Sequence, residues 1–273
     1  MRVLDRVRVA SIQLDVPDGE DVFERVARAA GLVASLAGAD LVLLPEIWNV
    51  GYFGFDRYAE LAEPIDGPTV SRLAEAARQA GAVVMAGSIV ERDGDRLFNT
   101  SVVLERDGSI AGTYRKIHLF GYGSKEPEVL TPGDAAVVVE TPLGPTGLAT
   151  CYDLRFPELF RAMVDRGAEA FLIPSAWPYP RVEAWQVLNR ARAIENQAWL
   201  ISANCAGGPP ASRYCGRSMV VDPWGTVVAA AGDRPDVVVA ELDRAAAHSA
   251  RADFPALRDR ALGPDGRRVD AVR

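Results

Sequence analysis

Histidine and cysteine are scarce in this sequence. The 273 residues include only two histidines and three cysteines, which are His118, His248, Cys151, Cys205 and Cys215. They lack the number and spacing of a zinc site or a disulfide framework, so we expect no metal and a reducing, cytoplasmic location. No complete glycine-rich dinucleotide or phosphate loop is present, so we expect no cofactor. The absence of G-x-S-x-G argues against a Ser-His-Asp hydrolase.

The sequence also lacks a net positive charge and long apolar runs. The chain has 30 Lys and Arg against 37 Asp and Glu, a net charge of −7. This balance argues against nucleic acid or an anionic membrane as a partner, because both require clustered basic residues. No stretch approaches 18 apolar residues without a charge, so we expect no membrane span. The first residues, MRVLDRVRVASIQLDV, alternate charged and apolar positions, which predicts a strand and not a signal peptide.

Apolar strand patterns alternate with amphipathic helical patterns along the whole chain. The predicted strands are 7–13, 41–44, 82–91, 98–105, 110–116, 136–140, 146–150, 170–174, 199–205, 217–222, 226–230 and 236–241. The predicted helices are 18–37, 66–80, 157–167, 181–198 and a segment after Arg244. With no linker or repeat, this pattern favours an α/β layered sandwich with mixed sheets. We expect a single domain over 1–273, its last 25 or so residues forming a C-terminal extension.

The segment PTGLATCYDLRFPE, residues 145–158, is the first candidate for chemistry. An apolar strand ends at Cys151, and a helix is predicted to start near Pro157. A cysteine at such a turn can be exposed as a nucleophile, with backbone N–H groups nearby to meet negative charge. A buried structural cysteine explains the position equally well. Cys205 and Cys215 are interpreted as structural.

A nucleophilic cysteine needs a base and a group that stabilises an oxyanion. Glu46 follows the apolar run LVLLP and precedes Ile47-Trp48, where burial would raise its pKa to suit proton transfer. Lys116 lies in a strand whose alternation places Tyr114, Lys116 and His118 on one face. A cation facing inward requires a partner. The alternatives are a solvent-facing Glu46 and a surface lysine.

Three segments in this order resemble the catalytic signatures of the nitrilase superfamily of carbon–nitrogen hydrolases. They are Leu44-Pro45-Glu46, Tyr114-Arg115-Lys116-Ile117-His118-Leu119 and Cys151-Tyr152-Asp153-Leu154-Arg155-Phe156-Pro157-Glu158. The resemblance implies a four-layer α-β-β-α sandwich with two mixed β-sheets. It also implies that Glu46 is the general base, that Cys151 is the nucleophile, and that Lys116 and the Tyr152 backbone N–H stabilise the tetrahedral intermediate.

Amidase members of the superfamily carry a second glutamate ahead of a Pro-Gly-Asp sequence. Here Glu126 takes that place, with Glu128 as the alternative. The resemblance implies that this glutamate positions the substrate nitrogen or holds Lys116.

The function implied is hydrolysis of a small non-peptide amide to a carboxylic acid and ammonia through a cysteine thioester. The stretch CYDLRFPE is similar to the omega-amidase branch. The alternatives are hydrolysis of a nitrile or of an N-carbamoyl amide by the same triad, a catalytically silent binding homologue, and a Cys-His hydrolase that uses His118. Members commonly form dimers, and the 181–200 helix with Trp185 and Trp199 could supply the interface of a homodimer or higher oligomer. Its apolar residues are explained equally well if it is a core helix.

Aromatic residues in the loops beyond these motifs are candidates for a substrate pocket. Tyr52 and Trp177 are the predicted substrate-binding residues, and Tyr122 and Tyr179 lie in similar loops. Such aromatic side chains serve equally often as core cover. Arg155 is interpreted as a structural ion-pair partner of Glu158, with substrate binding as the alternative.

Overall fold

Two sheets form the body of the computed structural model, which describes residues 5–17, 19–208, 213–263 and 267–268. The first sheet has the strand order β14 (Asp236–Asp243), β1 (Arg6–Gln13), β2 (Leu41–Leu43), β3 (Val83–Asp93), β4 (Arg96–Leu104) and β5 (Ile110–Arg115). Strands β1, β2 and β3 are parallel, and the other pairs are antiparallel. This sheet is therefore mixed.

The second sheet is mixed as well. Its strand order is β13 (Val227–Ala230), β12 (Met219–Val221), β9 (Trp199–Asn204), β8 (Ala170–Ser175), β7 (Gly144–Leu148) and β6 (Val137–Thr141). Strands β7, β8 and β9 are parallel. The two sheets share one core in which Val9 and Leu43 of the first sheet cluster with Leu148 and Leu172 of the second, all fully buried.

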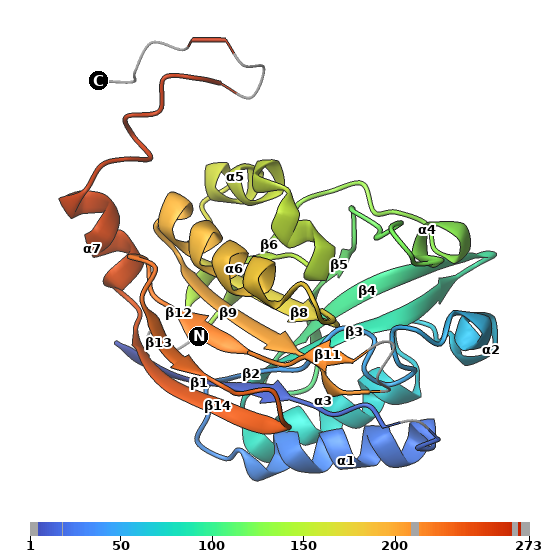
Figure 1. The fold of residues 1–273 in the computed structure, drawn as a ribbon. Coiled ribbons are helices and arrows are strands. Elements are labelled where there is room, and N and C mark those ends of the chain that lie inside the picture. Colours follow the sequence, from blue (N-terminus) through green and yellow to red (C-terminus); the bar gives the residue numbers. More distant parts are fainter. Residues whose placement is uncertain (1–4, 18, 209–212, 264–266, 269–273) are drawn as a thin grey trace.

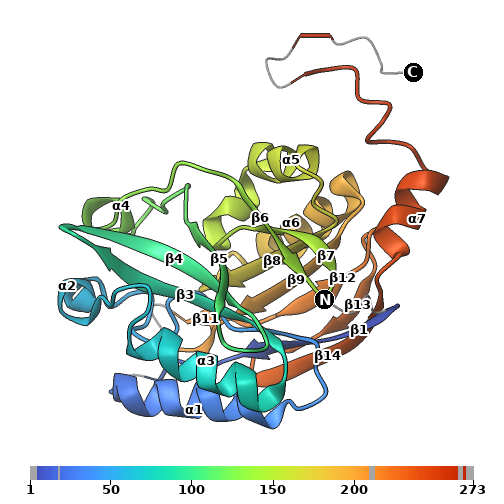
Figure 2. The ribbon, with the colours of Figure 1, turned by 180° about the vertical axis from the view of Figure 1, so that it is seen from behind.

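Helices cover both outer faces of the paired sheets (Figures 1 and 2). Helices α1 (Val22–Ser35) and α3 (Pro68–Ala80) lie on the first sheet, and α5 (Pro157–Asp165) and α6 (Val182–Asn196) lie on the second. In α1 the apolar residues Val26, Ala29 and Val33 recur at helical spacing and are buried. The predicted four-layer sandwich is thus confirmed. After α7 (Ala246–Asp253) the chain runs away from this body (Figure 1).

Several element ends differ from the predictions for local physical reasons. The helix predicted from residue 18 begins at Val22, because Asp21 is extended and caps the Phe23 and Glu24 N–H groups. The helix predicted to residue 198 ends at Asn196, because Gln197 has a left-handed backbone. The short elements η1 (Phe55–Arg57), α2 (Tyr58–Leu61), α4 (Glu126–Val129), η2 (Cys151–Arg155), β10 (Ala206–Gly207) and β11 (Tyr214–Cys215) were not predicted. Residues 269–273 of the predicted C-terminal extension lie outside the described residues.

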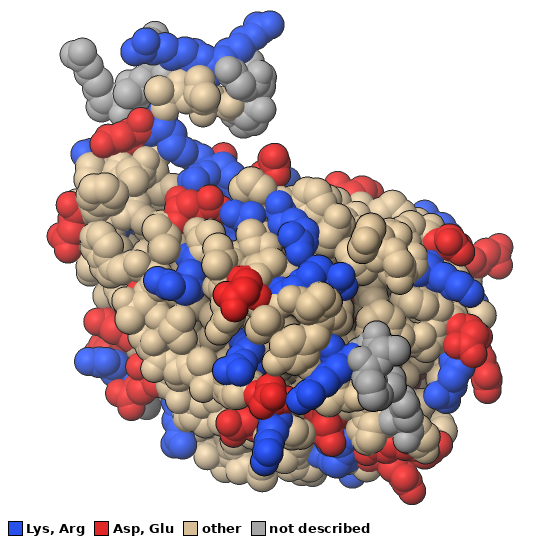
Figure 3. All heavy atoms as spheres, in the orientation of Figure 1, with Lys and Arg blue, Asp and Glu red and all other residues tan. Residues whose placement is uncertain are grey.

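The surface of the molecule carries charges of both signs. Basic and acidic side chains are interspersed over the face shown in Figure 3. In the part of the chain that the structure describes, no helix has both the length and the apolar character needed to cross a membrane.

The sheet edge at the carboxyl ends of several strands brings distant segments together. Glu46 follows β2, Lys116 directly follows β5, and Cys151 begins η2 shortly after β7. The two sheets are joined at this edge, where the Glu46 N–H donates to the Ser175 carbonyl at 3.3 Å. Functional residues of α/β folds commonly gather at such edges.

Gly87 shapes the loop that carries Glu46. It has a φ of +72° within an irregularity of β3, and a Cβ there would lie 1.9 Å from the Pro45 carbonyl oxygen. The N–H of the next residue, Ser88, donates to the Pro45 carbonyl at 3.1 Å. The Ser88 hydroxyl accepts a hydrogen bond from the Ile47 N–H, also at 3.1 Å. Glycine therefore permits the close approach that fixes the backbone on both sides of Glu46.

We predict that Gly87→Ala lowers the free energy of unfolding by at least about 4 kcal/mol, because the new methyl group would collide with backbone. Gly94→Ala is the matched control at the end of the same strand: its φ is +58°, and nothing lies within 4 Å of an added Cβ. Its expected loss is about 1–2 kcal/mol, that of a left-handed alanine. Equal losses in denaturant titrations would contradict the close-approach argument.

Candidate active site

Glu46, Lys116 and Cys151 meet in one buried cluster, as the sequence predicts. Glu46 and Lys116 have no exposed surface, and Cys151 is 8% exposed. The Lys116 Nζ donates to Glu46 Oε1 at 2.8 Å. The Cys151 thiol lies close enough to Glu46 and Lys116 for the charge of each to act on its pKa. The cluster therefore brings a thiol, a carboxylate and an ammonium together.

The two oxygens of Glu46 have different partners. Oε1 accepts from Lys116 and from the Asn99 amide, each at 2.8 Å. Oε2 accepts from the Ala176 backbone N–H at 2.9 Å. Ala176 follows β8, so the second sheet supplies a donor that orients a carboxylate carried by the first. Ile47, which follows Glu46, has a φ of +39°, a strained conformation for a β-branched residue.

Glu126 is the second glutamate of the cluster. It is fully buried at the start of α4, whereas Glu128 is exposed. Its Oε1 accepts from Lys116 Nζ and Asn99 Nδ2, both at 2.9 Å. Its Oε2 accepts from the Tyr52 hydroxyl at 3.0 Å. Of the two alternatives, the structure places Glu126 against Lys116.

The backbone at Cys151 resembles a sharp elbow. Cys151 has a φ of +48°, which is uncommon for a residue with a side chain and marks local strain. Thr150 and Asp153 form a capping box around η2, in which Asp153 Oδ2 accepts the Thr150 N–H at 2.8 Å. Asp153 also accepts the Tyr114 hydroxyl at 2.7 Å. The nucleophile turn is thereby tied to the strand that precedes Lys116.

His118 contacts the same turn through Asp153 and Phe156. Its Nδ1 lies 2.7 Å from Asp153 Oδ1, and its ring stacks on Phe156 with the ring centroids 3.8 Å apart. The imidazole thus orients Asp153. This arrangement disfavours the Cys-His alternative.

Burial and charge set the protonation of the cluster. Burial raises the pKa of the Cys151 thiol and the Glu46 charge raises it further, although Lys116 opposes the shift. Burial also raises the pKa of Glu46, with Lys116 acting against it. Burial lowers the pKa of Lys116, but the charges of Glu126 and Glu46 outweigh this effect and raise it well above its usual range. These shifts favour the thiol form of Cys151 and the ammonium form of Lys116 in the resting site.

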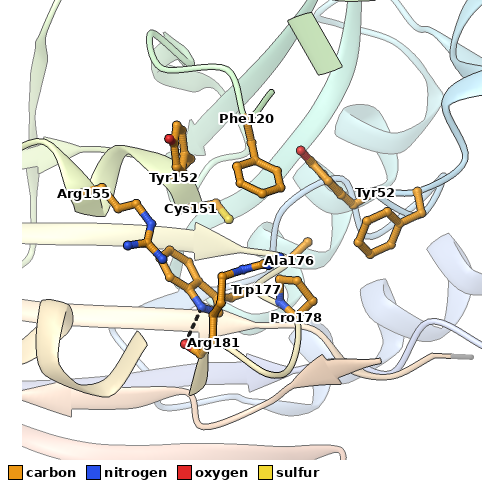
Figure 4. A pocket seen from close by; sticks show the side chains of 10 residues that line it. Tyr52, Phe120, Cys151, Tyr152, Arg155, Ala176, Trp177, Pro178 and Arg181 are labelled. Atoms are coloured by element: carbon orange, nitrogen blue, oxygen red, sulfur yellow. Dashed lines mark hydrogen bonds between the residues drawn. The ribbon is translucent and has the colours of Figure 1, made fainter. Parts of the chain in front are cut away.

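An aromatic pocket opens above Cys151 (Figure 4). The predicted substrate-binding residues Tyr52 and Trp177 both line it, together with Phe53, Phe120, Tyr152, Arg155, Ala176, Pro178 and Arg181. Tyr122, another aromatic candidate, is 81% exposed and lies outside this set. Within the described ranges, no group of three or more His, Cys, Asp or Glu side chains is placed to hold a metal ion.

The predicted ion pair between Arg155 and Glu158 is wrong. The Arg155 guanidinium lies over the Trp177 ring, 4.9 Å from its centroid, and lines the pocket. Glu158 is exposed on the first turn of α5. The reason is the unpredicted turn η2, which ends at Arg155 and separates it from the helix that carries Glu158.

Sequence reasoning missed several residues of the site, among them two polar ones, Asn99 and Arg181. Asn99 interrupts the apolar start of β4 as a fully buried polar residue, and this interruption is the only signal it gave. Arg181 precedes α6, and its guanidinium lies 5.3 Å from the centroid of the Phe120 ring. The Trp177 Nε1 donates to the Arg181 carbonyl at 2.9 Å, which fixes this residue at the pocket (Figure 4).

Several known proteins are similar in sequence to this chain, and the two given below are named as amidases. A family model described as carbon-nitrogen hydrolase matches residues 8–252. The 2-oxoglutaramate amidase of Paenarthrobacter nicotinovorans is 37% identical over 260 residues, which cover 92% of this chain and 88% of that protein. Omega-amidase NIT2 of Bos taurus is 38% identical over 246 residues, covering 86% and 88% respectively.

A solved structure has the same fold. The crystal structure of a Saccharomyces cerevisiae protein, described as a member of branch 10 of the nitrilase superfamily, matches with a TM-score of 0.86 and 32% identity. The match covers 96% of this chain and 99% of that one. Together with the family model, these similarities confirm the resemblance found in the sequence. The chain belongs to the carbon-nitrogen hydrolase family and is a hydrolase of carbon–nitrogen bonds.

Proposed function

We propose that this enzyme hydrolyses a small non-peptide amide through a thioester on Cys151. The observation that carries the proposal is the buried ion pair of Glu46 with Lys116, whose charges both act on the thiol of Cys151, a residue that lines an aromatic pocket. The names of the related amidases support an amide as the substrate.

In the first half-reaction Cys151 Sγ attacks the amide carbonyl carbon while Glu46 takes the thiol proton. Since the pKa of the thiol is raised, proton transfer accompanies the attack. The carbonyl oxygen becomes an oxyanion, which Lys116 and the Tyr152 backbone N–H stabilise. Glu46 then gives the proton to the amide nitrogen, the C–N bond breaks and ammonia leaves.

In the second half-reaction Glu46 takes a proton from water, whose oxygen attacks the thioester carbonyl. The same donors stabilise the second tetrahedral intermediate. The C–S bond then breaks, the carboxylic acid leaves, and the proton returns to the Cys151 sulfur. Glu126 holds Lys116 through both steps by its contacts of 2.9 and 3.0 Å.

The pocket favours an acyl group that carries its own carboxylate. Arg155 and Arg181 both line it, and neither guanidinium is paired with a carboxylate among the described residues. An arginine without an acidic partner is suited to bind a substrate carboxylate. We therefore infer that the substrate is the monoamide of a small dicarboxylic acid, in line with the names of the relatives.

The exposed apolar face of α6 supports the proposed homodimer. Val187 and Ile194 on this helix are 62% and 47% exposed, and Trp224 nearby is 56% exposed. The Gly225 backbone packs close to Ile194, so Trp224 and α6 share one surface. Exposed apolar clusters commonly mark such interfaces. The cytoplasmic location stays a prediction from cysteine usage.

We predict that Cys151→Ala abolishes ammonia release and that Lys116→Met lowers kcat/KM by at least about 10²–10³, the effect of losing an oxyanion donor. Cys205→Ala and His118→Asn are the controls and are expected to retain turnover. Cys205 is a second buried thiol, and the His118 Nδ1 is paired with Asp153 Oδ1 at 2.7 Å. Activity of Cys151→Ala within tenfold of the wild type would overturn the proposal.

We predict that Arg155→Met reduces the preference for an anionic amide over a neutral one. The measured quantity is the ratio of kcat/KM for glutaric acid monoamide to that for butyramide, which is expected to fall about 10²-fold because a charge-assisted contact is lost. Arg190→Met is the control, since Arg190 lies on α6 outside the pocket and donates to the Gly225 carbonyl. An unchanged ratio in Arg155→Met would exclude a carboxylate contact. Nitrile and N-carbamoyl substrates in the same assays test the alternative reactions.

A further inference from the structure

Asn99 lies between the two buried carboxylates of the site. It belongs to β4, has no exposed surface, and donates through Nδ2 to Glu46 Oε1 at 2.8 Å and to Glu126 Oε1 at 2.9 Å. Both amide hydrogens are thus used on two different glutamates. The Asn99 carbonyl also accepts the Lys116 backbone N–H at 2.8 Å. One residue therefore contacts both carboxylates and the backbone of Lys116.

The unpaired amide oxygen of Asn99 indicates that packing alone does not explain an asparagine at this position. Asn99 Oδ1 is buried and has no hydrogen-bond partner among the described residues. A buried polar atom without a partner is unfavourable, and an apolar side chain of similar size would avoid that penalty. The two hydrogen bonds that Asn99 donates therefore explain why an amide side chain occupies this position.

The charges of the cluster explain why a neutral donor is needed. Two carboxylates share one ammonium, Lys116, and each Oε1 already accepts from it. A second cation in the place of Asn99 would neutralise the charges of the two carboxylates. A further carboxylate there would repel them. The Asn99 amide donates to both glutamates without adding a charge and does not itself titrate.

The same bonds distinguish the two oxygens of Glu46. Oε1 is occupied by Lys116 and Asn99, while Oε2 accepts only the Ala176 N–H. A carboxylate oxygen with two strong donors has little capacity left for a proton. Oε2 is thus the oxygen that can receive the thiol proton.

We infer that Asn99 is a positioning residue, which keeps Glu46 ionised and leaves Oε2 free to act as the base toward Cys151. The inference rests on the proposed role of Glu46 and adds a residue that acts through it. It does not require Asn99 to touch the substrate.

The other groups around the carboxylates do not titrate in the range that matters. Burial raises the pKa values of Tyr52, Tyr58 and Tyr214 well above their usual range, and the charges of the glutamates add to this. Burial does the same for the thiol of Cys205, whose Sγ lies 3.8 Å from the Glu46 carbonyl oxygen. With Lys116 protonated throughout, the acid limb of a pH–rate profile reports the protonation of Glu46.

The test is the pH dependence of kcat/KM for glutaric acid monoamide in the wild type and in Asn99→Leu. Loss of a donor to a carboxylate raises its pKa, so the acid limb is expected to move to higher pH by about one unit. Thr100→Val is the matched control. Thr100 is the next residue of β4, is buried, and gives its hydroxyl to the carboxylate of Glu91, away from the site. Its acid limb is expected to coincide with that of the wild type.

The inference is overturned if the acid limb of Asn99→Leu coincides with that of the wild type, however large the loss of rate. Asn99 would then have a structural role only. If Asn99→Leu does not fold, as judged by thermal unfolding, Asn99→Ser is measured in the same way and is expected to shift in the same direction. Glu46→Gln separates this inference from the proposed function. A Glu46→Gln enzyme with wild-type activity overturns both, whereas an inactive one with an unshifted Asn99 variant overturns only the role of Asn99.

Discussion

The burial of the Lys116 ammonium is the constraint on which the site depends. An unpaired charge at that depth would be strongly destabilising, so Lys116 requires the carboxylates of Glu46 and Glu126 around it. Those carboxylates in turn repel each other, and the Asn99 amide between them reduces this effect. The result is a fixed set of charges beside the Cys151 thiol. Such preorganisation is what stabilisation of an oxyanion requires, because the donors need not rearrange during the reaction.

The fold supplies this arrangement by joining two sheets at one edge. Glu46 comes from the first sheet, yet its Oε2 is held by the Ala176 N–H of the second. Cys151 comes from the second sheet, yet Asp153 ties its turn to Tyr114 and His118 of the first. Each half of the molecule therefore orients a reactive group carried by the other. A shift between the sheets would separate base from nucleophile, which explains the dense hydrogen bonding across this edge.

Much of the fold and the three central residues could be predicted from the sequence, because strand and helix periodicity and the three signature segments are local patterns. The partners of those residues could not. The family pattern pointed to Glu126 but left Glu128 open, because only the folded chain shows which face of the four-residue helix is buried. Arg155 was assigned to Glu158 because the turn η2 gave no periodic signal. Asn99 lies 53 residues from Glu46 and 27 from Glu126, so only the folded chain shows that it joins them.

The central claim is that the acyl group of an amide is carried by the Cys151 sulfur. The most direct test is peptide mass spectrometry of the enzyme quenched with acid during turnover of glutaric acid monoamide. The account predicts an added mass equal to the acyl group on the peptide that contains Cys151, and none on the peptides that contain Cys205 or Cys215. Release of ammonia with no acyl group on Cys151 at any quench time, or an acyl group on another residue that turns over at the catalytic rate, would contradict it.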